Sequence, residues 1–308
     1  AVFAHWHYSW LYHGYLIMML FCGCPALLAI DGDGLPARNS ALSSQSFLTS
    51  AVEAYLKPAR FQGGFPRACL CIFLFSCGTA PMFFILLMIR DLVGIEEAVP
   101  LQRHFSMVSI LFFLSAAVAA ALNALAAPPK KNGANKGAPV QGEVRAQSFL
   151  LTAVSVVAFG IVCILLPGIR LFKDLSIRIR VFYVLAGFLG ATFGSVFSRF
   201  QDCNWQLLPP GVETANAMGY STLWKLLGTG LGNFGAGLVL DLFVYSHSTA
   251  SIGHQSRSVG PSTTMIAYKL SGYVAMCFSS AACVLASAGL VLTLPRLANS
   301  AKSAKAAA

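Results

Sequence analysis

The chain has 308 residues, of which 56% are hydrophobic and 10% are charged, and its formal net charge is +10. Soluble domains carry about 25% charged residues, so this composition excludes an ordinary soluble protein and favours lipid as the solvent. The positive excess is typical of loops that orient membrane proteins, and we see no segment long enough to form a basic groove for nucleic acid.

Seven stretches of the chain are long and apolar enough to cross a bilayer. A spanning helix needs about 20 mostly apolar residues. We therefore expect an all-α, multi-pass membrane protein with about seven transmembrane helices, in the plasma membrane or an endomembrane. The stretches are 8–30, 68–89, 105–127, 147–167, 181–201, 220–245 and 267–294.

Residues 1–30 contain the first predicted helix, which begins among aromatic and histidine residues. The spacing of His5 and His7 could bind a metal, but an aromatic belt at the membrane interface is the favoured interpretation. The Cys-x-Cys pairs also lack partner ligands at zinc-finger spacing. We therefore predict neither a metal site nor a cofactor. The residues concerned are His5, His7, His13, Cys22, Cys24, Cys69 and Cys71.

A polar linker, 31–67, follows and contains one short amphipathic pattern. Its apolar residues recur every three or four positions before Pro58, which predicts a helix lying at the membrane interface. These residues are Phe47, Leu48, Val52, Tyr55 and Leu56.

The later connections set the expected orientation. Arg90 and Asp91 end the second stretch and are expected to form a boundary ion pair. The loop 128–137 and the tail 295–308 are basic, and we expect the tail to be disordered. More Lys and Arg residues fall on the side of the linker, this loop and the tail, which predicts a cytoplasmic C-terminus.

Two pairs of glycines at four-residue spacing predict close helix contacts. Gly190 and Gly194 lie in the fifth stretch, and Gly228 and Gly232 lie in the sixth. In lipid, helices associate through small residues that let their backbones approach. Static packing and an ability to bend or slide both remain open interpretations.

Few charged residues fall within the apolar stretches. Arg199 and Asp202 lie at the end of the fifth stretch, and Lys225 lies one turn into the sixth. We expect these three to form a charge cluster, serving either as a gate or coupling-ion site or as a salt bridge at the headgroup boundary. Asn233, in the middle of the sixth stretch, is expected to contact a substrate or to hydrogen-bond between helices.

No enzyme motif is present. The sequence has no Gly-x-Ser-x-Gly elbow, no His-Glu-x-x-His pair and no Walker loop, and no pattern pairs a nucleophile with a base. We therefore predict that the chain is not an enzyme.

The part of the chain from 187 to 241 resembles the tenth and eleventh spans of the major facilitator superfamily, and 86–94 resembles the exit of the seventh. The resemblance is carried by Gly187–Gly194, Gln206–Pro209, Ala217–Gly219, Trp224 and Gly237–Asp241. It implies that residues 1–30 are the sixth span, that 31–67 joins the two halves, and that 68–294 is the C-terminal six-helix bundle. The loop 128–137 departs from the family because it lacks an Asp-Arg core. Phe200 and Gln206 also stand where cation-coupled sugar transporters tend to carry Asp.

The resemblance implies secondary active transport of a small solute by alternating access, with this chain as a fragment that lacks an N-terminal half. No pattern selects a substrate, a coupling ion or a direction. The alternatives are a seven-helix receptor-like membrane protein and a non-transporting membrane subunit. A retinal protein is disfavoured, because Lys269 lies at the start of the last stretch and not in its middle.

Overall fold

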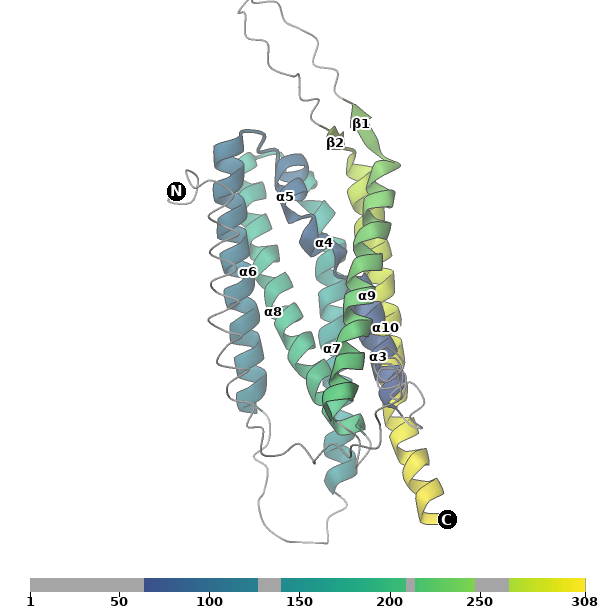
Figure 1. Ribbon diagram of the computed structural model, residues 1–308. Helices are drawn as coiled ribbons and strands as arrows, with labels where there is room; N and C mark the ends of the chain where they lie inside the picture. Colours follow the sequence, from purple (N-terminus) through teal and green to yellow (C-terminus); the bar gives the residue numbers. More distant parts are fainter. Residues whose placement is uncertain (1–63, 127–139, 209–213, 247–265, 308) are drawn as a thin grey trace, which may run out of the picture. The chain divides into compact units, whose positions relative to one another are not determined.

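The computed structural model describes residues 64–126, 140–208, 214–246 and 266–307 (Figure 1). The first predicted span, the amphipathic helix and the basic loop lie outside these residues. Within them the chain is almost entirely helical. The long helices in chain order are α3 (Phe65–Cys77), α6 (Ala98–Ala126), α7 (Val140–Leu165), α8 (Leu175–Leu207), α9 (Thr214–Asp241) and α10 (Leu270–Ala307).

Four helices in the described part of the chain are long and apolar enough to cross a membrane. Their candidate spans are Ala98–Ala126, Gln147–Leu171, Leu175–Leu207 and Leu270–Leu294. α9 has 28 residues, which is sufficient length, but its glycines and polar side chains keep it out of this apolar group. These four helices indicate a multi-pass membrane protein.

The second predicted span is interrupted. α3 ends at Cys77, and short pieces follow it: α4 (Ala80–Phe83), α5 (Ile85–Met88) and the π-helix η5 (Ile89–Val93). Pro81 lacks a backbone N–H and cannot continue the ladder of hydrogen bonds. At the break, the Thr79 hydroxyl donates to the Ser76 carbonyl at 2.7 Å, and the Gly78 N–H bonds to the Phe75 carbonyl at 3.0 Å.

The ends of two other elements also differ from expectation. α9 begins six residues earlier than the predicted stretch, at Thr214, and is followed by strand β1 (Val244–Ser246). β1 pairs antiparallel with β2 (Ile266–Tyr268), and Val244 lies opposite Tyr268. α10 continues through the predicted tail to Ala307, so the expectation of a disordered tail was wrong. Ala and Lys, which are common in the tail, are strong helix formers.

All four glycines of the predicted pairs lie where two helices meet. A Cβ atom added at Gly190 or Gly194 would come within 3.0 Å of the backbone of α6, at Phe112 and Ala116. A Cβ at Gly228 or Gly232 would collide in the same way with the backbone of α3, at Phe73 and Cys77. Glycine is therefore required at both contacts because the backbones themselves touch.

An aromatic cluster fills the centre of the bundle. Phe75 of α3 lies between Phe159 of α7 and Phe200 of α8, with ring centroids 5.1 and 5.6 Å away. Phe193 of α8 joins this cluster to Phe112 of α6, at 5.7 Å. By contrast, only 11% of the apolar window of α6 is buried, against 50% for α7. Most of the surface of α6 is therefore left uncovered by the other described helices.

The main helix contacts follow a regular pattern. α6 packs along α8, and α3 packs along α9; α7 packs along both α8 and α10, and α10 packs along α3. Suppose that α3 is exchanged with α8, α6 with α9 and α7 with α10. The same pairs of helices are then in contact as before the exchange. Successive helices run in opposite directions (Figure 1), so the exchange also inverts each helix. The contact between α9 and α10 is an exception, since α6 and α7 have no comparable contact.

Replacing Gly232 with Ala should destabilise the bundle. The added methyl group meets the Cys77 backbone, which cannot move aside as a side chain would, so we expect a loss of about 1–3 kcal/mol in unfolding free energy. Unfolding in mixed detergent and SDS micelles measures it. Gly235→Ala is the matched control on the same helix, because a Cβ there meets nothing within 4 Å. Equal stability of the two variants would contradict the contact.

Candidate functional site: the polar side of α9

α9 carries a line of polar side chains along one side. Thr222, Lys225, Thr229 and Asn233 follow one another at spacings of three or four residues, which places them above one another on a helix. The opposite side is apolar and exposed, and consists of Leu223, Leu227, Leu231, Phe234 and Leu238. Polar residues of a membrane helix usually face the bundle interior or a water-filled cavity. We call this line of four residues the polar side of α9.

Lys225 lies against an aromatic ring and not against a carboxylate. Its Nζ is 4.0 Å from the centroid of the Phe197 ring, a cation–π contact between α9 and α8. No described carboxylate lies within ion-pair distance of it. Lys225 is 11 residues from the start of α9 and 16 from its end, so it lies deep in the helix and not one turn from its start as expected.

Arg199 is held by α6. Its Nη2 donates to the Asn123 Oδ1 at 2.7 Å, and the Asn123 Nδ2 donates to the Ser198 Oγ at 3.1 Å. The Arg199 Nε is buried without a hydrogen-bond partner among the described residues. The guanidinium is therefore bound by a neutral amide. Sequence analysis missed Asn123, although a single amide inside an apolar run signals an interhelical contact.

The expected charge cluster is not formed. Arg199, Asp202 and Lys225 make no ion pair with one another in the described structure, and Asp202 is exposed. The Asn204 amide donates to the Ser221 hydroxyl at 2.8 Å, so this turn of α8 faces α9 through Asn204. Residues two positions apart on a helix point to different sides, and Asp202 is therefore turned away from α9. The expectation was wrong because it considered position along the helices and not the side of α8 on which Asp202 lies.

Asn233 is the fourth residue of the polar side. Its Oδ1 is buried and has no hydrogen-bond partner in the part of the chain that the structure describes. It lies eight residues after Lys225, about 12 Å along the helix. An unpaired buried amide oxygen is costly, so a ligand or a water molecule that reached the Asn233 Oδ1 would be stabilised by a hydrogen bond.

Asp91 joins three elements at the end of the bundle where η5, β2 and the start of α10 meet. The carboxylate pairs with Arg90, as the sequence predicted. Its Oδ2 also accepts hydrogen bonds from the Tyr273 hydroxyl at 2.7 Å and from the Tyr268 backbone N–H at 3.2 Å. The hydrogen bond to Asp91 raises the pKa of Arg90. The pKa of Tyr268 is raised mainly by burial and, to a smaller extent, by the negative charge of Asp241. Asp91 thus ties η5 to β2 and the start of α10.

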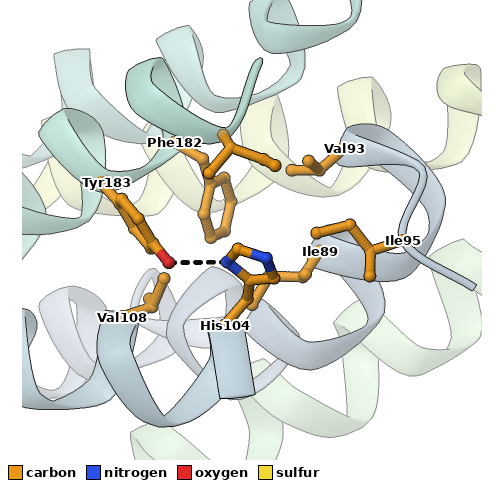
Figure 2. Close-up of a pocket in the computed structure, with 8 residues that line it drawn as sticks. Ile89, Val93, Ile95, His104, Val108, Phe182 and Tyr183 are labelled. Carbon is orange, nitrogen blue, oxygen red and sulfur yellow. Dashed lines mark hydrogen bonds between the residues drawn. The ribbon is translucent and has the colours of Figure 1, made fainter. Parts of the chain in front are cut away.

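A small recess lies beside this junction, between η5, α6 and α8. Figure 2 shows His104 with its Nδ1 bonded to the Tyr183 hydroxyl, at 2.6 Å, and with apolar side chains around the ring. The cavity has a volume of about 10 Å³. Solute pockets are usually about 300–1,000 Å³, so this recess is too small for a substrate. Its lining residues are Ile89, Val93, Ile95, His104, Val108, Ile179, Phe182 and Tyr183.

Among the described residues, no group of three His, Cys, Asp or Glu side chains could hold a metal ion. His5, His7, His13, Cys22 and Cys24 lie outside the described residues. In comparisons with known proteins, no family model, curated protein or solved structure matches this chain.

Replacing Asp91 with Asn should weaken the junction at this end of the bundle. The amide cannot pair with Arg90, which is 19% exposed, and we expect a loss of about 1–3 kcal/mol in unfolding free energy. Thermal unfolding in detergent measures this. Asp241→Asn is the control, because Asp241 is exposed and lies 3.5 Å from the Tyr268 hydroxyl. A loss of the same size in both variants would show that Asp91 has no special role.

Proposed function

We propose that this chain forms the C-terminal six-helix bundle of a secondary transporter of the major facilitator type, which moves a small solute by alternating access. The observation that carries the proposal is the pattern of helix contacts. Apart from the contact between α9 and α10, it is preserved when α3, α6 and α7 are exchanged for α8, α9 and α10. Each half of that superfamily consists of two inverted three-helix repeats, which produce this kind of exchange.

The glycine contacts support the same interpretation. The contact of α6 with α8 and that of α3 with α9 are equivalent under the exchange, and each contains a glycine pair. The pair lies on α8 in one contact and on α9 in the other, which are not equivalent helices. The two contacts therefore share a direct approach of the helix backbones, although the glycines lie on helices that the exchange does not relate.

The polar side of α9 supplies a surface for a solute. In transporters of this type, substrate sites lie near the bilayer midplane between the two halves. Lys225 and Asn233 lie well inside α9, away from its ends. Alternating access also needs a second bundle, and the exposed apolar surface of α6 suits contact with such a bundle or with lipid. In this proposal the C-terminal end of α10 is cytoplasmic, following the Lys and Arg distribution.

Accessibility from both sides of the membrane tests the proposal without knowledge of the substrate. The full-length protein carrying Thr229→Cys or Asn233→Cys is placed in sealed vesicles, and an impermeant thiosulfonate reagent is added inside or outside. Alternating access opens the same surface to each side in turn, so we expect both variants to react from both sides. Leu231→Cys, on the exposed apolar side of α9, is the matched control and should not react.

The outcomes separate the hypotheses. Reaction from one side alone favours a receptor-like protein or a non-transporting subunit, because neither needs to open the surface to both sides. Reaction from neither side contradicts a water-filled path along α9. The unsubstituted protein gives the background from native cysteines, of which Cys77 and Cys283 are partly exposed.

A further inference from the structure

The side of α9 that faces α8 has an excess positive charge. Lys225 is half-buried in the helix, and none of the described carboxylates pairs with it. A cation within the bilayer costs about 2.5–3.5 kcal/mol on insertion scales and is usually compensated by a partner or a cavity. Among the described residues, the only specific contact of its ammonium group is with the Phe197 ring. A cation–π contact leaves the ammonium hydrogens free to bind an anion.

Apolar aromatic surface lies directly beside this charge. Phe197 is 45% exposed, so its ring is available to a ligand. It stacks on Phe193, with ring centroids 6.1 Å apart and planes inclined by 22°. Phe193 is in turn packed against Phe112 and Phe159 of the core, at 5.7 and 6.4 Å. The cation and a rigid aromatic surface are thus neighbours.

The remaining groups of the polar side are hydrogen-bonding and neutral. The Thr229 hydroxyl donates to the Lys225 carbonyl at 3.0 Å, which leaves its oxygen able to accept. The Asn233 Oδ1 is an acceptor without a partner among the described residues. Lys225 is therefore the one side chain of the polar side that would attract an anion strongly.

We infer that this surface binds a small organic carboxylate, whose carboxylate group pairs with Lys225 and whose apolar body lies on Phe197. The inference deepens the proposed function and rests on it. The depth of Lys225 argues against a lipid headgroup as the anion. Eleven residues separate it from the start of α9, about 16 Å along the axis, whereas headgroups lie at the ends of a spanning helix.

Binding of radiolabelled benzoate to the full-length protein tests this inference. The protein is placed in phosphatidylcholine nanodiscs, and binding is measured by equilibrium dialysis. We expect saturable binding that weakens at least about tenfold in Lys225→Gln and changes less than about threefold in Lys225→Arg, because arginine keeps the charge. Lys173→Gln is the matched control, since Lys173 is exposed in the connection before α8 and should leave binding unchanged.

Further measurements test the two parts of the ligand. Benzyl alcohol, which lacks the charge, should not compete with benzoate. Phe197→Leu keeps an apolar side chain without the ring, so the preference for benzoate over acetate should fall. Nanodiscs containing phosphatidylglycerol should bind benzoate as well as phosphatidylcholine nanodiscs do. Competition by that lipid would instead assign Lys225 to a headgroup and overturn the inference.

The inference also fails if benzoate does not bind saturably or binds equally to Lys225→Gln. Its failure is distinguishable from failure of the proposed function. Two-sided labelling of Thr229→Cys with no benzoate binding leaves a transporter whose substrate is not an organic carboxylate. Melting temperatures of the Lys225 variants identify any loss of binding that is due to misfolding, and Lys225→Arg then decides the outcome.

Discussion

Direct backbone contact at two glycine pairs is the constraint on which the rest of the structure depends. Lipid is as apolar as a leucine side chain, so burying leucine between helices gains little in a membrane. Close packing is what remains, and it requires positions without a Cβ. Gly190 and Gly194 set the distance of α8 from α6, and Gly228 and Gly232 set that of α9 from α3.

The polar side of α9 follows from this arrangement. With Gly228 and Gly232 turned toward α3, the helical period places Lys225 toward α8, where Phe197 is exposed. The apolar residues of α9 are then left on the outside, as the exposure of Leu231 and Phe234 indicates. One packing choice thus sorts the helix into a contact side, a polar side and an exposed apolar side. Gly190 and Gly194 impose a backbone contact of the same kind between α8 and α6.

The sequence predicted those features that depend on the properties of a single residue type. Only glycine permits backbone contact, so the four-residue spacings pointed to the contacts that the structure has. Apolar length likewise indicated α6, α7, α8 and α10. Reasoning failed where the answer depends on which side of a helix faces its neighbour. Asp202 and Lys225 were expected to pair, but α8 turns Asn204 and Phe197 toward α9 and leaves Asp202 exposed. The partner of Arg199 depends on how α6 lies along α8, which no local pattern encodes.

The interruption after Cys77 divides one apolar segment between two sets of neighbours. On the N-terminal side of the break, α3 is fixed to α9 by the glycine contact. The Cys71 carbonyl there accepts a hydrogen bond from the Ser287 hydroxyl of α10 at 2.7 Å. Gly78 itself lies so close to Val284 and Ser280 of α10 that a Cβ would collide with them. On the C-terminal side of the break, the hydrogen bond of Asp91 to Tyr273 holds η5 against the start of α10. A continuous helix would transmit a tilt along its whole length. This segment is interrupted, and it contacts α10 at Cys71, at Gly78 and at Asp91. A displacement of α9 would act on both α3 and α4, which it contacts, whereas Asp91 beyond them is bound to the start of α10.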